Sequence, residues 1–159
     1  MKNKSFNLIF KGNAINTGSM RNDIDVIFES MDERFQLATD EGAFHGGKGT
    51  APPPLALFTA SLCGCVMTQI KAFGKKLNIQ VSEIKIDATM EWNGTITDEG
   101  PYLAECKGYN LDIDIISNET LDRKKKLLNA AIKGCFIEAS LKPGLVKHRL
   151  KNMDNWISV

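Results

Sequence analysis

The chain has 159 residues, 43% of them hydrophobic and 25% charged, and its formal net charge is +1. This composition is typical of an ordinary soluble globule, and a nearly neutral chain has no overall field that would attract nucleic acid or an acidic membrane surface. We therefore expect a single domain over residues 1–159, with no nucleic-acid partner and no membrane partner. The short basic run at 123–126 is interpreted as a solvated helix face.

The N-terminus has neither the apolar stretch nor the small-residue cleavage site of a secretory signal, which predicts a cytoplasmic protein. The longest apolar segment, Leu55–Met67, has thirteen residues and is expected to be too short to span a bilayer. Four cysteines in such a chain are expected to be reduced thiols rather than a disulfide framework.

The N-terminal part of the chain contains three short runs in which apolar and polar residues alternate. This period-2 pattern predicts a three-stranded antiparallel meander, with strands at 6–10, 24–28 and 35–37. A loop rich in Gly and Pro follows at 40–53.

A long helix is predicted from Pro54 to Lys76, because proline suits the first helical turn and apolar residues recur at steps of three and four. Its first half is apolar nearly all round, so we expect it to be buried on several sides.

The C-terminal part predicts a β-hairpin, two helices and a last strand. Alternation over 84–92 and 109–115 marks the hairpin strands, and Asn93-Gly94 is a turn signal. Cap-type residues at 117–120 open a helix that runs to about Cys135. A short helix over 136–141 and a strand over 145–150 are expected after it.

Two cysteines stand on helices far apart in the sequence, Cys65 and Cys135, each directly after a glycine. A helix start or a nearby cation can turn such a thiol into a reactive thiolate, so the two are a candidate redox pair. Free cysteines are also among the most buried residue types, and packing is the alternative interpretation.

The other two cysteines are interpreted as inactive. Cys63 lies two positions before Cys65, about 200° around the helix, so it faces away and is assigned to packing. Cys106 shares its strand parity with Asn110 and Asp112, which predicts an exposed thiol without a partner. No metal site is expected, because His45 and His148 are the only histidines and there is no Cys-x-x-Cys.

Three segments, together with the order of the predicted elements, resemble the OsmC/Ohr family (osmotically induced protein and organic hydroperoxide resistance protein). They are the Gly-Gly loop at 38–50, the helix segment at 54–65 and the turn at 140–146. The resemblance implies an α+β fold of the OsmC-like type, in which antiparallel sheets wrap around central helices. It also implies a homodimer formed by strand exchange.

The resemblance further implies a cysteine-based hydroperoxide reductase. Cys65 would attack the peroxide, and Cys135 would resolve the resulting sulfenic acid to a disulfide. An external dithiol would then reduce the disulfide, with no bound cofactor. An arginine of the N-terminal sheet would stabilise the thiolate, and Arg21 is the nearest match, with Arg34 as the alternative.

Two departures from the family pattern predict weak peroxidase activity. The peroxidases of the family carry a Glu in the first turn of the helix to hold the arginine, whereas this chain has Ala56 there. The resolving cysteine is usually followed by Pro-Val, and here it is followed by Phe136-Ile137.

Two other functions fit the same pattern. One is a binding module of this fold for an apolar or acyl ligand, in a pocket lined by Phe58, Leu62 and Phe136. The other is a structural or regulatory dimer whose cysteines are inert.

Overall fold

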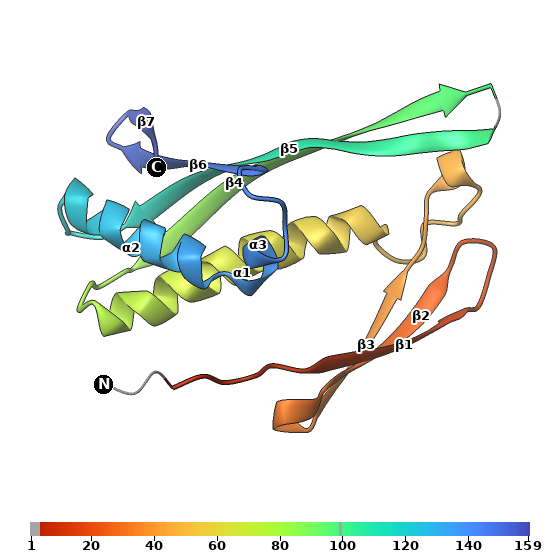
Figure 1. Ribbon diagram of the computed structural model, residues 1–159, viewed down its shortest axis with the longest axis horizontal. Helices are drawn as coiled ribbons and strands as arrows, with labels where there is room; N and C mark the ends of the chain where they lie inside the picture. The colour runs from red at the N-terminus through yellow and green to blue at the C-terminus, as the bar shows by residue number, and fades with distance from the viewer. Residues whose placement is uncertain (1–3, 99) are drawn as a thin grey trace. The chain divides into compact units, whose positions relative to one another are not determined.

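The computed structural model describes residues 4–98 and 100–159 and has an α+β fold (Figure 1). The fold class expected from the sequence is confirmed. The chain divides into two compact units, one that ends at Phe58 and one that runs from Thr59 to Val159. The expectation of a single domain over 1–159 stays a prediction, and the two units are described separately here.

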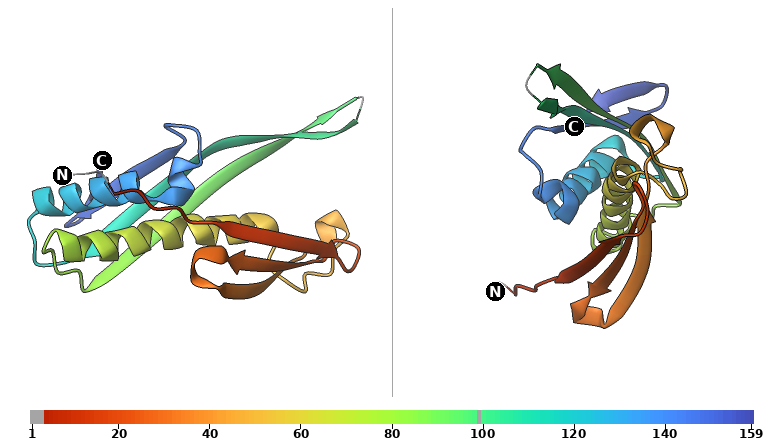
Figure 2. Two further views of the ribbon diagram at one scale, coloured as in Figure 1. Left: turned by 60° about the horizontal axis from the view of Figure 1, so that its bottom comes forward. Right: turned by 90° about the vertical axis from the view of Figure 1, so that its right-hand side faces the viewer.

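The N-terminal unit contains an antiparallel meander in the order β1-β2-β3 (Figure 2). Its strands are β1 (Phe10–Asn16), β2 (Asn22–Phe28) and β3 (Glu33–Thr39). Two short 3-10 turns follow the second and third strands, at Glu29–Met31 and Ala43–His45. The first strand therefore begins at Phe10, where the sequence pattern predicted that it would end. The alternation over 6–10 was a misleading signal, because that segment precedes the sheet.

Helix α1 (Pro54–Lys76) has the bounds that the sequence predicted. Its fully buried side chains form one stripe at steps of four residues, namely Leu62, Val66 and Ile70, with the buried Gly74 next in line. The other faces are half-buried or exposed in the single chain, so the expectation of burial on several sides is not met there.

By length and composition, α1 is sufficient to cross a membrane, which contradicts the expectation that its apolar stretch was too short. Core helices of soluble proteins meet the same criterion, and the stripe of buried side chains identifies α1 as a core helix of this fold.

The C-terminal unit is a four-stranded sheet in the order β4-β5-β6-β7, with α1 and α2 on one of its faces (Figures 1 and 2). Among the described residues of this sheet, β5 pairs in parallel with β6, and the other two pairings are antiparallel. The elements are β4 (Glu83–Thr97), β5 (Gly100–Ile116), α2 (Leu121–Gly134), α3 (Phe136–Ala139), β6 (Val146–Asn152) and β7 (Asn155–Ser158).

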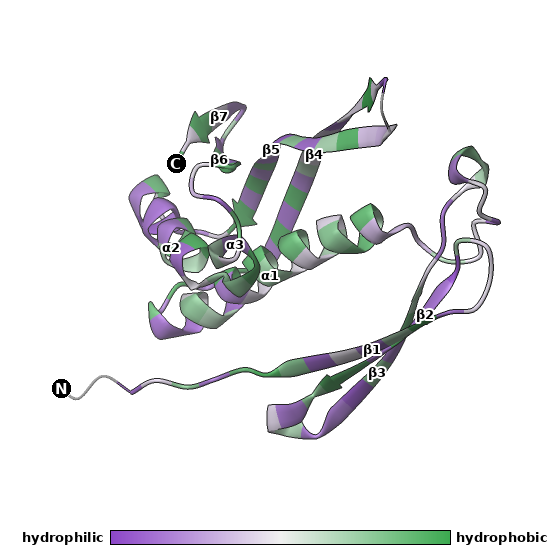
Figure 3. Cartoon of the chain, turned by 45° about the vertical axis from the view of Figure 1, so that its right-hand side comes forward, coloured by the Kyte–Doolittle hydropathy of each residue, from purple (hydrophilic) through white to green (hydrophobic). Residues whose placement is uncertain are grey.

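The core of this unit lies between the sheet and the helices. Alternate residues in the second half of β5 are buried. Hydrophobic and hydrophilic residues alternate along β4 and β5 (Figure 3). The fully buried members on β5 and α2 are Leu111, Ile113, Leu127, Leu128 and Ala131. Burial of these side chains is the main stabilising contribution, about 1.5–3 kcal/mol for each large apolar residue.

Two predicted features of this unit are wrong. The Asn93-Gly94 signal is not a turn, since both residues lie inside β4 and pair with Glu105 and Ala104 of β5. The ring of Tyr102 packs 3.2 Å from where a Cβ of Gly94 would lie, so the glycine accommodates an aromatic neighbour instead. Strand β7 was missed because it has only four residues.

Candidate functional site

Cys65 and Cys135 lie close together in the C-terminal unit, near enough for the Cys65 thiol to raise the pKa of Cys135. Cys65 is half-buried on α1. Cys135 is fully buried at the junction of two helices, where its N–H donates to Ile132 O at the end of α2. Its Sγ accepts a hydrogen bond from the Glu138 N–H of α3 at 3.5 Å. The fold therefore brings together two thiols that are 70 positions apart.

The environment of Cys135 favours the neutral thiol. Burial, the hydrogen bond to Cys65 and the negative charge of Glu138 together raise the pKa of Cys135 to about 12, although the Glu138 N–H acts in the opposite direction. At neutral pH Cys135 is therefore a neutral thiol. Two neighbouring thiols are the arrangement from which a disulfide can form.

Gly134 explains how α2 comes close enough to α1 for this contact. A Cβ at position 134 would lie 2.5 Å from the ring of Phe73 on α1, a distance at which the ring would have to move. The glycine of the second Gly-Cys pair is therefore explained by packing, since position 134 has no room for a side chain beside Phe73. Gly64 has nothing within 4 Å of its Cβ position, so the first pair has no such reason.

The residue that donates to Cys135 has a buried ion-pair partner. His148 on β6 is 6% exposed, and its Nε2 is 3.2 Å from Glu138 Oε2. From the sequence, His148 was interpreted only as a possible metal ligand, and Glu138 was not singled out. The strand parity that His148 shares with the buried Leu150 was the signal that could have placed it on the inner face.

The remaining cysteines differ in how well they were predicted. Cys63 is half-buried, and burial raises its pKa, in agreement with a packing role. Cys106 is half-buried as well, so the expectation of an exposed thiol without a partner is wrong. Its side chain is hydrogen-bonded to the buried Tyr109.

A β-bulge explains the error at Cys106. Glu91 pairs with Gly108 and Trp92 pairs with Cys106, so Lys107 is an extra residue on β5. One extra residue reverses the side-chain parity of the strand, which turns Cys106 toward the face of Tyr109 instead of that of Asn110.

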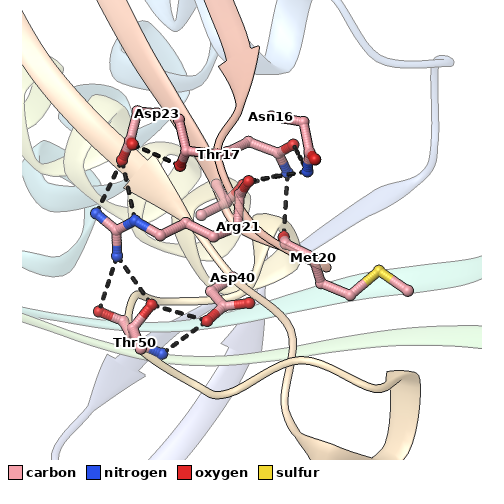
Figure 4. Close-up of polar contacts among 9 residues, drawn as sticks. Asn16, Thr17, Met20, Arg21, Asp23, Asp40 and Thr50 are labelled. Atoms are coloured by element: carbon pink, nitrogen blue, oxygen red, sulfur yellow. Dashed lines mark hydrogen bonds and ion pairs between the residues drawn. The ribbon is translucent and has the colours of Figure 1, made fainter.

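Arg21 is held by several polar partners within the N-terminal unit (Figure 4). Its Nε and Nη2 donate to Asp23 Oδ1 at 3.0 and 2.8 Å, and its Nη1 donates to Thr50 Oγ1 at 2.9 Å. Asp23 also accepts from Thr17 Oγ1 at 2.7 Å, and this bond and the guanidinium keep the pKa of Asp23 below its usual value. Asp23 therefore orients the arginine, a role that the resemblance gave to a Glu in the helix.

Thr50 connects Arg21 to a second carboxylate. The Thr50 N–H and hydroxyl both donate to Asp40 Oδ2, at 2.9 and 2.8 Å, and these bonds lower the pKa of Asp40. The loop between them is tight, because a Cβ on Gly47 would lie 1.9 Å from Glu41 O. The Gly-Gly loop of the sequence thus brings Thr50 within reach of both side chains.

The other predicted site residues lie apart from these contacts. Arg34 is exposed on β3 and pairs in register with Ile27. Leu62 is fully buried in the core, so it is unavailable to line an open pocket, whereas Phe136 is 51% exposed. Among residues 4–98 and 100–159, no three His, Cys, Asp or Glu side chains are grouped so that they could hold a metal ion.

Comparisons with known proteins agree with the fold. The sequence profile of the family described as OsmC-like protein matches residues 47–148. An OsmC-like hydroperoxide resistance protein from Jannaschia sp. CCS1 is 39% identical, and the match covers 96% of this chain and 98% of that one with a TM-score of 0.56.

Two further solved structures are more distant. An organic hydroperoxide resistance protein OsmC from Legionella pneumophila is 18% identical, with 93% and 97% of the two chains covered and a TM-score of 0.60. The organic hydroperoxide resistance protein OhrB of Bacillus subtilis is 20% identical, with 92% and 98% covered and a TM-score of 0.55. No curated protein matches the chain.

Proposed function

Because the chain belongs to the OsmC-like protein family, we propose that it is a thiol-dependent hydroperoxide reductase in which Cys65 and Cys135 carry the reaction. The observation that carries this proposal is the proximity of the two thiols in the folded chain. A redox pair needs adjacent sulfurs, and a packing role for either cysteine does not. The names of the relatives, which describe hydroperoxide resistance, support the same class of substrate.

The proposed reaction has one oxidation by peroxide, one condensation to a disulfide and one reduction by an external dithiol. The Cys65 thiolate attacks the outer peroxide oxygen, the O–O bond breaks, and the alkoxide leaves and takes up a proton to become an alcohol. Cys135 sulfur then attacks the Cys65 sulfenic acid, so that an S–S bond forms while the S–O bond breaks and water leaves with the Cys135 proton. An external dithiol reduces the disulfide by thiol exchange.

Arg21 is the proposed cation that stabilises the Cys65 thiolate and orients the peroxide. A guanidinium held by hydrogen bonds keeps its geometry better than a free one, and Asp23 and Thr50 hold Arg21 from two sides. Bulky organic hydroperoxides are the proposed substrates in preference to hydrogen peroxide, because the names of two relatives refer to organic hydroperoxides.

Thiol counting tests this function. We expect one equivalent of an organic hydroperoxide to remove two of the four thiols, and peptide mapping to find them joined as Cys65–Cys135. Cys63 and Cys106 serve as internal controls and should stay reduced. If no thiol is lost, the reductase is excluded and a ligand-binding module of this fold becomes the better account.

The homodimer is a further part of the proposal, supported by an apolar face of the N-terminal sheet. Cross-strand register places Phe10 opposite Phe28, Val26 opposite Phe35, and Ile24 opposite Leu37. Phe10, Phe35 and Leu37 are 57%, 45% and 47% exposed. Apolar faces of this kind mark interaction sites, and we propose that a second copy of the chain covers this one.

Light scattering at micromolar concentration should accordingly give twice the chain mass of 17.6 kDa. Leu37→Glu places a charge on the apolar face and should shift the protein toward the monomer. Gln36→Glu, on the opposite face of the same strand, is the matched control and should stay dimeric. A monomeric wild type would contradict the dimer.

A further inference from the structure

The Glu138–His148 pair contacts Cys135 from a direction that the proposed reaction does not use. Glu138 is the third residue of α3, where its N–H donates to Cys135 Sγ at 3.5 Å. Its carboxylate lies 3.2 Å from His148 Nε2, and the two side chains are 16% and 5% exposed. The residue whose N–H contacts the resolving thiol thus has a carboxylate that is anchored to β6 through a buried imidazole.

We propose that Glu138, held in place by His148, is a positioning residue that keeps Cys135 protonated and aligned with Cys65, so that peroxide reacts at Cys65 first. This inference rests on the proposed function, since it assigns a role within the same thiol pair. It adds two residues to the site, one on α3 and one on β6.

The negative charge of Glu138 is expected to disfavour ionisation of the Cys135 thiol. A negative charge near a thiol disfavours the thiolate, and the charge of Glu138 contributes to the raised pKa of Cys135. A protonated Cys135 is a poor nucleophile toward peroxide. The pair is therefore expected to act on Cys135, because the Glu138 N–H is hydrogen-bonded to Cys135 Sγ.

The other charged groups on neighbouring elements are paired or point to solvent. Arg149 of β6 forms an ion pair with Asp112 of β5, and Lys151 lies 3.3 Å from Asp114. Lys147 of β6 and Lys133 of α2 are exposed. From α1, the titratable group that faces Cys135 is the Cys65 thiol.

Two measurements on the full-length protein test the pair. The first follows alkylation of Cys135 by iodoacetamide between pH 6 and pH 9 with peptide mapping, which needs no peroxide turnover. The second follows disulfide formation in a single turnover after Cys65 has been oxidised. Glu138→Gln keeps the size and the N–H of residue 138 but removes its charge, so both rates should rise about tenfold at pH 7.

His148→Phe should act in the same direction as Glu138→Gln. The phenyl ring fills the same buried space but cannot hold the carboxylate, so the charge of Glu138 is no longer fixed and both rates should rise, by less than in Glu138→Gln. His148→Gln keeps an N–H donor and should return both rates to nearly the wild-type value. Lys147→Gln changes one charge at the exposed neighbouring position of β6 and should change neither rate. Cys63 and Cys106 alkylation provides an internal control in every variant.

The measured rates distinguish the proposed role of the Glu138–His148 pair from a merely structural role. Faster reaction in Glu138→Gln and in His148→Phe, with nearly wild-type rates in His148→Gln, supports the pair. Slower disulfide formation in Glu138→Gln and His148→Phe shows a merely structural role and overturns the proposal, as does an unchanged Cys135 rate in Glu138→Gln. If the wild type forms no sulfenic acid with hydroperoxide, the proposed function fails, whereas the alkylation rates still decide the role of the pair.

Discussion

Cys65→Ser is expected to abolish hydroperoxide consumption, because a serine hydroxyl is not ionised at neutral pH and is not oxidised by peroxide as a thiolate is. Stopped-flow measurement of organic hydroperoxide loss checks this directly. Cys135→Ser should retain the first oxidation and stop there, with a Cys65 sulfenic acid that a dimedone probe traps. The two variants thus separate attack from resolution.

Cys63→Ser is the matched control for this experiment, since Cys63 lies on the same helix and is also half-buried. It should consume hydroperoxide at the rate of the wild type. If Cys65→Ser retains the wild-type rate, Cys65 is not the nucleophile and the reductase assignment is wrong. If Cys135→Ser still forms an intramolecular disulfide, then another thiol resolves the sulfenic acid.

Arg21→Gln is expected to lower kcat/KM for an organic hydroperoxide on the order of a hundredfold, because loss of a fixed cation removes stabilisation of developing charge at the reacting centre. Arg21→Lys should recover little of this, since a lysine lacks the planar fork with which Arg21 contacts Asp23 and Thr50. Steady-state kinetics with a dithiol reductant measures both variants.

The alternative arginine provides the control. Arg34→Gln removes the same charge from an exposed position of β3 and should leave kcat/KM within about twofold of the wild type. A hundredfold loss in Arg34→Gln, with no loss in Arg21→Gln, would transfer the role to Arg34. Thr50→Val removes one hydrogen-bond acceptor of Arg21 and should give a loss intermediate between those of Arg21→Gln and Arg34→Gln.

The polar network around Arg21 also changes the expectation of weak activity. The sequence offers no carboxylate at Ala56 in the first turn of α1, which left the arginine without an orienting partner. In the structure Asp23 takes this role, and it lies only two residues from Arg21 along the chain. We therefore expect the absence of a helix carboxylate to cost less activity than the sequence alone indicated.

Residue type and spacing along the sequence were sufficient to predict several helices and strands. Pro54 and the three- and four-residue spacing of apolar side chains determine α1, which begins and ends at the predicted residues. Alternation likewise located β2 and the strands of the hairpin, because one face of each strand must be buried. The family resemblance, carried by three short segments, is confirmed by the match over 47–148.

Contacts between distant segments depended on the tertiary structure. The bulge at Lys107 reverses the parity of β5 and gives Cys106 the environment of Tyr109, which no count along the sequence would show. Glu138 meets His148 only because β6 pairs in parallel with β5. Parallel pairing joins segments through a long crossover, so its register depends on packing of the whole unit.

The sequence by itself determined the helix that carries Cys65, the glycine before Cys135 and the positions of the candidate arginines, because each depends on residue type and local spacing. The tertiary structure alone decided that the two thiols lie close together, that Asp23 and Thr50 hold Arg21, and that Glu138 with its buried histidine lies against Cys135. The physical reason is that charge and burial act through space: the pKa of Cys135 is set by groups from α1, α3 and the protein interior, whose distances are determined only when the chain is folded.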